Sequence, residues 1–337
     1  MTKSRRVVHA RAPVRVCDVG GWTDTWYYGR GKVTNVAINL YSHVRLQAND
    51  LDSVRIHSED LDLDTQIMDY RKVEYDGVLD LLKAAVKRMG VREGLDVFVR
   101  ADAPPGCGTG TSASVAVALI GALSAWKREP FLSFQAASLA HAIETEELGL
   151  QSGVQDQYAS AYGGVLHMDV AYPRVQISRI PVSTATICEW ESRCVLVYLG
   201  SRQSSDVHLK VIERYQQGNE DTIKAHDQLK ELAREMALAF YEGDVNRIAE
   251  VMNLNWAAQK RLHPDITNDS IVDLEELARE CGASGFKVNG AGGGGSAVVM
   301  AGAGREYELK KRLQEASYLV FPCLVNDHGL QVWEGRA

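Results

Sequence analysis

The sequence predicts a mixed α/β fold of the α+β type, divided into two domains. The chain has 337 residues, which exceeds one average domain. Segments with the alternation of strands and segments with the spacing of helices follow one another along its whole length. From about residue 174 the pattern changes to short strands and longer charged helices, so we expect domains at residues 1–180 and 181–337.

The N-terminal domain is expected to begin with strands. Residues 5–19 alternate apolar and polar side chains, as a half-buried strand does, and the pattern breaks at Gly20 and Gly21. β-branched residues predict further strands at 33–48 and 53–58. The next expected elements are a helix at 76–89 with one apolar face, a strand at 94–103, a helix at 112–126 that is apolar nearly all round, a helix at 133–149 closed by Gly149, and a strand at 165–170.

The C-terminal domain is expected to combine a few strands with long charged helices. The predicted elements are a strand at 193–200, amphipathic helices over 205–262, a helix at 271–282, a glycine cluster within 285–300 that leads into a strand, a helix at 305–316 and closing strands.

Composition narrows the classes of partner. The net charge of −7 argues against nucleic acid and against an anionic membrane surface, because both favour a basic face. No apolar run approaches 18 residues, and no signal-peptide pattern opens the chain. The six cysteines lack zinc-like spacing, and scattered thiols are typical of a reducing compartment. We therefore expect a cytoplasmic protein.

Two glycine-rich segments are candidate phosphate sites, although neither has a standard nucleotide signature. The Walker pattern GxxxxGK[ST] is absent. Residues 290–295 match GxGxxG, but a strand-like segment follows where the dinucleotide motif requires a helix. We interpret that match as accidental.

The first segment, APPGCGTGTSASVAVA at 103–118, lies between a predicted strand and a predicted helix. Its glycines allow close approach of a ligand, and the start of a helix favours an anion. Thr109, Thr111 and Ser112 add hydroxyls for a phosphate oxygen or a magnesium ion. A helix-entry turn with Ser/Thr capping has the same pattern, so the local sequence leaves both interpretations open.

The second segment is NGAGGGGSA at 289–297. Its alternatives are a tight connection between strands and a backbone surface that faces a ligand. Four consecutive glycines exceed what a turn needs, which favours the ligand-facing interpretation.

Three segments together resemble the motifs of the GHMP kinase superfamily, named after galactokinase, homoserine kinase, mevalonate kinase and phosphomevalonate kinase. They are RAPVRVCDVGGWTDT at 11–25, PPGCGTGTSAS at 104–114 and GFKVNGAGGGGSA at 285–297, in the order of the family. The resemblance implies an N-terminal ribosomal-S5-like domain and a C-terminal ferredoxin-like domain. It also implies that ATP and the acceptor meet in the cleft between them.

The segments GGWTDT and GVQDQYASAYGG resemble the branch that phosphorylates the anomeric hydroxyl of sugars, in particular fucokinases and heptose 7-phosphate kinases. Galactokinases have a glutamate where this chain has Gly21. The resemblance implies an ATP- and Mg²⁺-dependent sugar 1-kinase, monomeric or homodimeric, with a monosaccharide or a sugar phosphate as acceptor. The alternatives are a galactokinase-like kinase of another sugar, a non-catalytic sugar or ATP sensor, and a decarboxylase on the same fold.

The resemblance also implies roles for single residues. Asp156 matches the aspartate that accepts the proton of the attacking hydroxyl, and Arg15 matches the cation beside it. Glu144 and Ser112 match the Mg²⁺ ligands, with Thr111 as a second hydroxyl. The ordinary alternatives are a capping aspartate, a solvent-facing strand arginine and a solvated helix glutamate.

The implied sugar pocket surrounds Asp24, which matches the family's acceptor of sugar hydroxyls. Gly20 and Gly21 would let the backbone approach the ring, Trp22 would pack on its apolar face, and Gly153 would line the same pocket. The implied nucleotide-binding residues are Pro105, Gly106, Gly108, Thr109, Gly110, Thr111, Ser112, Ala113, Gly292, Gly293 and Gly294. The candidates for binding a phosphate on the acceptor are Arg30, Lys32 and Arg202.

Overall fold

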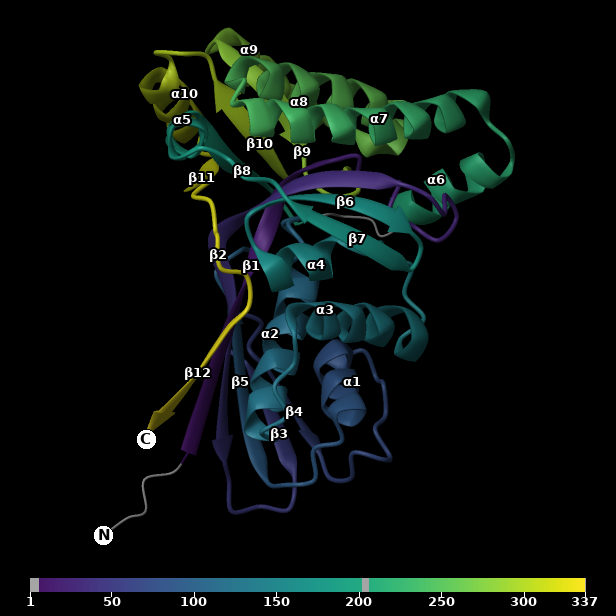
Figure 1. The fold of residues 1–337 in the computed structure, drawn as a ribbon, viewed down its shortest axis with the longest axis vertical. Helices are drawn as coiled ribbons and strands as arrows, with labels where there is room; N and C mark the ends of the chain where they lie inside the picture. The colour runs from purple at the N-terminus through teal and green to yellow at the C-terminus, as the bar shows by residue number, and fades with distance from the viewer. Residues whose placement is uncertain (1–5, 202–205, 337) are drawn as a thin grey trace.

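Two β-sheets organise the chain in the computed structural model, which describes residues 6–201 and 206–336 (Figure 1). Within these residues the first sheet has eight strands, in the order β12-β1-β2-β5-β3-β4, with β6 paired to β2 and β7 paired to β6. Its strands are β1 (Arg6–Val19), β2 (Lys32–Ala48), β3 (Val54–Ser58), β4 (Leu63–Ile67), β5 (Leu95–Ala101), β6 (Val165–Ala171), β7 (Arg174–Arg179) and β12 (Gln331–Arg336).

The long antiparallel pair of β1 and β2 connects the two groups of strands in this sheet, β5-β3-β4 and β6-β7. The first residues of β2 pair with β6, and its last residues pair with β5. A register shift between Pro13 and Val14 interrupts the pairing of β1 with β2, as a bulge does. The part of β1 beyond this shift carries Arg15 and Asp18, which line the cleft between the sheets.

Helices cover one face of the first sheet (Figure 1). They are α1 (Asp80–Met89), α2 (Thr111–Trp126), α3 (Ser133–Ala142) and α4 (Gln155–Tyr162). α2 packs against β1, β2 and the other three helices, so its apolar residues are buried on all sides, as the sequence predicts.

The prediction of one continuous helix at 133–149 is wrong for its last turns. α3 ends at Ala142 and continues as a π-helical segment, Ile143–Glu147. The backbone N–H of Leu148 donates to the carbonyl of Ile143 across this wider turn. π-helical turns often occur at functional sites, and this one carries Glu144.

The second sheet has the order β11-β8-β10-β9 among the described residues. Its strands are β8 (Cys194–Gly200), β9 (Ala283–Val288), β10 (Gly295–Ala301) and β11 (Leu319–Pro322). The helices of this half are α5 (Thr184–Arg193), α6 (Asp206–Gln216), α7 (Glu220–Glu242), α8 (Val245–Lys260), α9 (Asp269–Glu280) and α10 (Glu306–Glu315), with a 3₁₀ turn at Pro264–Ile266. α8 lies directly on β9 (Figure 1).

The mixed α/β fold expected from the sequence is confirmed. The expected helical stretch 205–262 is observed as α6, α7 and α8, apart from Ser205, which lies outside the described residues. The boundary at residue 180 falls between β7 and α5, but β12 returns to pair with β1 in the first sheet. The division at residue 180 stays a prediction. Among the described helices, none combines the length and the apolar character needed to cross a membrane.

Candidate active site

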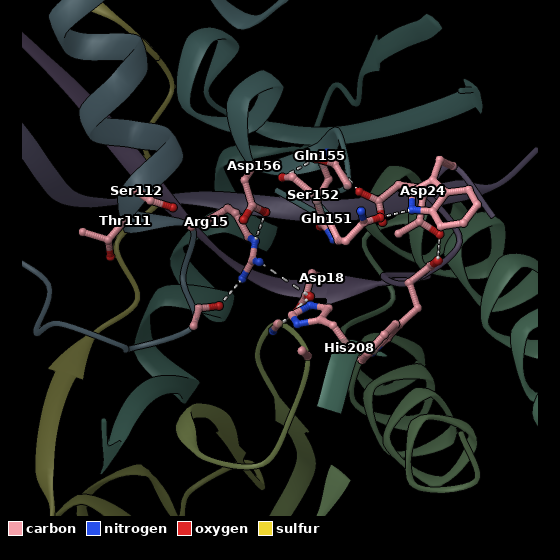
Figure 2. Close-up of a pocket in the computed structure, with 18 of the residues that line it drawn as sticks. Arg15, Asp18, Asp24, Thr111, Ser112, Gln151, Ser152, Gln155, Asp156 and His208 are labelled. Carbon is pink, nitrogen blue, oxygen red and sulfur yellow. Dashed lines mark hydrogen bonds and ion pairs between the residues drawn. The ribbon is translucent and has the colours of Figure 1, made fainter. Parts of the chain in front are cut away.

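A cleft of about 330 Å³ opens between the two halves of the molecule (Figure 2). Residues from four segments line it, namely 15–27, 106–112, 151–156 and 208–212, together with Gly290 and Ala291. The cleft therefore joins the three glycine-containing motifs with the start of α4, although they lie far apart in the sequence.

An ion pair between Arg15 and Asp156 lies in this cleft (Figure 2). Arg15 comes from β1 and Asp156 from the first turn of α4, and Arg15 Nε donates to Asp156 Oδ1 at 2.8 Å. Arg15 Nη1 donates to the carbonyl of Gly108. Burial opposes the charge of Arg15, but the carboxylates of Asp156 and Asp18 outweigh it and raise its pKa. Arg15 is thus a fixed cation that holds an accessible carboxylate, because the Asp156 side chain is 27% exposed.

The loop that leads into α2 carries no Ser/Thr cap. The residue before the helix is Gly110, whose φ is 75°, and no side chain caps the first turn. A Cβ on Gly110 would lie 2.9 Å from Asp156 Cγ, so glycine permits both the left-handed backbone and the close approach to Asp156. The capping interpretation of this segment is therefore wrong, and the first turn of α2 faces the cleft through Thr111 and Ser112.

The structure divides the expected nucleotide residues into two groups. Gly106, Gly108, Gly110, Thr111 and Ser112 line the cleft. The others are not among the described residues that line it: Pro105, Thr109, Ala113, Gly292, Gly293 and Gly294.

Three residues of the second group make contacts outside the cleft lining or beneath it. Thr109 is fully buried, and its carbonyl accepts the backbone N–H of Arg15. The carbonyl of Pro105 accepts the hydroxyl of Tyr198 from β8. Gly293 donates its backbone N–H to the carbonyl of Ile266. Their roles in nucleotide binding stay predictions.

The tail glycines approach the first loop through Gly295 and Ser296. A Cβ on Gly295 would lie 2.9 Å from the carbonyl oxygen of Cys107, and Ser296 Oγ donates to that oxygen at 2.6 Å. The two glycine-rich segments therefore touch, while Gly290 and Ala291 face the cleft.

Asp24 lies at the end of the cleft formed by residues 22–27 and 151–155 (Figure 2). It is buried, and Oδ2 accepts the backbone N–H of Gln155 at 3.0 Å. Burial raises the pKa of Asp24 to about 6, and the nearby Asp156 adds to the increase. Gly153 lines this region. Trp22 lies against His208, with 4.9 Å between the centroids of their rings.

Gly20 and Gly21 are not among the described lining residues and have packing roles instead. A Cβ on Gly20 would overlap the carbonyl oxygen of Lys32, and a Cβ on Gly21 would lie 3.0 Å from Asp18 Oδ2. Their expected contact with the sugar ring stays a prediction.

Glu144 lies behind the cleft lining. It is buried, and Oε2 accepts hydrogen bonds from Ser152 Oγ at 2.7 Å and Gln157 Nε2 at 2.8 Å. Burial raises the pKa of Glu144 to about 7, and Asp156 adds to the increase. No hydrogen bond to Oε1 occurs within the described part of the chain, so one oxygen of a nearly buried carboxylate is available to a cation. Carboxylate and hydroxyl oxygens are ligands that Mg²⁺ accepts, with water and phosphate completing its shell. The roles of Glu144 and Ser112 as Mg²⁺ ligands stay predictions.

The sequence analysis did not assign several of the residues that line the cleft. Asp18, Trp26, Gln151 and His208 all face the cleft, and Trp26 Nε1 donates to Gln151 Oε1. Trp26 lies two positions from Asp24, and Gln151 lies two positions from Gly153. Their closeness in sequence to these predicted pocket residues could have identified them. His208 comes from α6, and nothing local in the sequence marks it.

The three candidates for an acceptor phosphate receive no support from this geometry. Arg30 is exposed in the turn before β2, and Lys32 forms an ion pair with Asp169 on β6. Neither is among the described residues of the cleft lining. Arg202 lies outside the described residues.

Comparison with known proteins agrees with this architecture. The family model described as the GHMP kinases N terminal domain matches residues 77–164, and the GHMP kinases C terminal model matches residues 236–319. Together the two matches cover just over half of the chain.

Two curated relatives match most of the chain. The D-glycero-alpha-D-manno-heptose 7-phosphate kinase of Campylobacter jejuni is 27% identical over 97% of this chain and 99% of its own length. The bifunctional fucokinase/GDP-fucose pyrophosphorylase of Arabidopsis thaliana is 29% identical over 90% of this chain and 31% of its own length.

A solved structure shares the fold. The D-glycero-D-manno-heptose 1-phosphate kinase of Bacteroides thetaiotaomicron superposes with a TM-score of 0.81 at 25% identity, over 97% of this chain and 98% of that one. Both family domains occur here in their order along the chain, and the fold is shared over nearly its full length. The chain therefore belongs to the GHMP kinase family.

Proposed function

We propose that this protein is an ATP- and Mg²⁺-dependent sugar kinase that phosphorylates the anomeric hydroxyl of a monosaccharide or sugar phosphate, giving the sugar 1-phosphate and ADP. The observation that carries this proposal is the Asp156 carboxylate, which Arg15 holds at the junction of the glycine loop and the Asp24 pocket. The heptose kinase and the fucokinase among the relatives favour a heptose phosphate or a fucose-like sugar as acceptor.

The proposed reaction begins with the hydroxyl of the acceptor. Asp156 accepts its proton as the oxygen attacks the γ-phosphorus of ATP, and the bond from that phosphorus to the β–γ bridging oxygen breaks to release ADP. Arg15 orients the carboxylate and offsets negative charge on the transferred phosphoryl group.

The start of α2 provides the complementary site for the phosphates of ATP. Its free backbone N–H groups and the positive end of its dipole follow Gly108 and Gly110, and no side chain caps its first turn. Glu144 and Ser112 would hold Mg²⁺, which neutralises charge on the β- and γ-phosphates when bound.

The pocket around Asp24 suits a hydroxylated ring. Asp24 supplies a hydrogen-bond acceptor, Gln151 and Ser152 supply further polar atoms, and Trp22 and Trp26 supply flat apolar surfaces. Sugars present alternating hydroxyls and apolar faces, so this combination favours a sugar over an aliphatic acid as acceptor.

The test is ADP release in the presence of ATP and Mg²⁺ across a panel of acceptors. The panel contains heptose 7-phosphate, fucose, galactose and mannose, with mevalonate and homoserine for the other acceptors of the family. Two-dimensional ¹H–³¹P correlation NMR of the product then identifies the phosphorylated oxygen, because the phosphorus of a 1-phosphate correlates with the anomeric proton. ADP formation with a sugar and a 1-phosphate product supports the proposal. Sugar binding without ADP formation identifies a sensor instead, and turnover of mevalonate alone contradicts the sugar assignment.

A further inference from the structure

A buried ion pair joins the two sheets beneath the cleft. Lys287 from β9 donates through Nζ to Oδ1 of Asp18 on β1 at 2.8 Å, and the two residues are 269 positions apart in the sequence. Their side chains are 0% and 1% exposed. Lys287 Nζ also donates to the carbonyl of Val288 at 2.8 Å and to Gln259 Oε1 at 3.4 Å, so all three of its N–H donors are used.

Asp18 connects this pair to the reacting groups (Figure 2). Its Oδ2 lies 3.9 Å from Arg15 Nη2. The backbone N–H of Gly290, which lines the cleft at the start of the second glycine segment, donates to the same carboxylate at 3.1 Å from Oδ2. One carboxylate from the first sheet therefore contacts Arg15, Lys287 and the tail loop.

The distances indicate how this carboxylate acts on Arg15. Two aspartates attract the same guanidinium, yet Arg15 donates to Asp156 at 2.8 Å and stays 3.9 Å from Asp18. Hydrogen bonds from Lys287 Nζ to Oδ1 and from the Gly290 N–H to Oδ2 hold the Asp18 carboxylate, so it attracts Arg15 without bonding to it directly. Arg15 Nε and Nη1 thus remain available to Asp156 and Gly108.

Stability by itself does not account for these charges. Desolvation of a buried ion pair offsets much of its attraction, and apolar replacements of such pairs are often neutral or stabilising. A need to hold Arg15 in position would explain why Asp18 and Lys287 are charged residues at this buried site.

We propose that Asp18 is a positioning residue for phosphoryl transfer: held by Lys287, it fixes the Arg15 guanidinium against Asp156 and fixes the tail glycine loop to the same point. The proposal rests on the proposed kinase function and adds residues from both sheets to it. Through the Asp18–Lys287 pair, the positions of Arg15 and Asp156 depend on how the two sheets pack against each other.

The test compares Asp18→Asn, Lys287→Met and the double variant in steady-state kinetics and thermal unfolding. We expect Asp18→Asn to lower kcat about 10- to 100-fold and to change the KM for the acceptor by no more than about twofold, because the acceptor pocket is untouched. Lys287→Met frees Asp18 to bond Arg15, and we expect a similar loss of kcat.

The double variant separates position from stability. Each single variant leaves one buried charge without its partner and lowers the melting temperature. The double variant removes both charges, so we expect the melting temperature to recover and kcat to stay low. Recovery of kcat together with the melting temperature, or an unchanged kcat in Asp18→Asn, would overturn the proposal.

Arg193→Met is the matched control. Arg193 is a buried cation at the far end of the second sheet, where it pairs with Glu189 and donates to the carbonyl of Ala301. We expect its loss to lower the melting temperature and leave kcat unchanged.

A crystal structure of Asp18→Asn tests the inference independently of turnover. If the wild type phosphorylates no acceptor, the proposed function fails, but the positioning role can still be judged. Arg15 Nε displaced from Asp156 supports that role, and Arg15 Nε still at 2.8 Å from Asp156 Oδ1 refutes it.

Discussion

A Cβ atom at position 153 would overlap the carboxylate of Asp24. Glycine is required here because the backbone before α4 runs against the Asp24 side chain. Two residues later, the backbone N–H of Gln155 donates to Asp24 Oδ2. The Asp24 pocket and the segment before Asp156 therefore share one packing constraint.

Gly153→Ala should displace Asp24 and the start of α4 together. We expect kcat/KM for the acceptor to fall about 10- to 100-fold, because small displacements of positioned groups cost this much. The KM for ATP should change little. A KM for ATP that rises as much as the KM for the acceptor would contradict this assignment of the pocket.

Asp156→Asn keeps the shape of the side chain and removes its capacity to accept a proton. We expect kcat to fall about 10²- to 10⁴-fold, with the affinity for ATP retained. Calorimetric titration with an ATP analogue checks the affinity. Asp169→Asn on β6 is the matched control, since Asp169 pairs with Lys32 outside the cleft lining, and normal turnover in Asp156→Asn would refute the catalytic role.

Gly110→Ala and Gly149→Ala separate strain from collision. Both glycines have positive φ, 75° and 66°, so both substitutions cost about 1–2 kcal/mol of backbone strain. A Cβ on Gly110 also meets Asp156, whereas a Cβ on Gly149 meets nothing within 4 Å. We expect both variants to lose stability in urea unfolding, Gly110→Ala more than Gly149→Ala because of the collision, and we expect a loss of kcat in Gly110→Ala alone. Equal kinetics in the two variants would show that the approach to Asp156 is unimportant.

The raised pKa of Asp24 predicts a dependence of acceptor binding on pH. Burial moves this pKa from 3.8 to about 6, and only the ionised carboxylate accepts a hydroxyl proton in a strong hydrogen bond. We expect kcat/KM for the acceptor to fall about tenfold per pH unit below pH 6. Asp24→Asn should weaken acceptor binding and remove this part of the profile.

The same shift in pKa has the opposite effect on stability. Between pH 4 and 6 the folded state binds the proton of Asp24 more tightly than the unfolded chain does. The contribution of Asp24 to stability is therefore fully present below pH 4 and decreases as pH rises through about 6. Urea unfolding of the wild type and Asp24→Asn across this range measures the difference, and a contribution that increases with pH would contradict it.

Glu144→Gln tests the proposed Mg²⁺ site. The amide retains the shape that Ser152 and Gln157 contact but removes the charge, so we expect the Mg²⁺ concentration for half-maximal rate to rise about tenfold or more. Glu146→Gln, on the same π-helical segment but exposed and paired with Arg88, is the control and should need no additional Mg²⁺. An unchanged Mg²⁺ requirement in Glu144→Gln excludes this residue as a ligand.

The sequence by itself determined most elements and the family. Local patterns suffice for this, because alternation and helical spacing report which side chains are buried, and the three glycine-containing motifs occur in a fixed order. The continuous apolar run of α2 required a helix enclosed on all sides. The resemblance to the GHMP kinases implied that Arg15 lies beside Asp156, and the two residues do form an ion pair.

Tertiary structure alone decided how distant residues combine. The pairing of Asp18 with Lys287 and the arrival of His208 from α6 depend on how the two halves pack, and the return of β12 to β1 completes the first sheet. No local pattern encodes these contacts. The π-helical turn at Glu144 and the close approach of Gly153 to Asp24 are likewise seen only in the tertiary structure. Contacts across hundreds of residues are fixed only when the cores of both sheets form, and they set the geometry of the cleft.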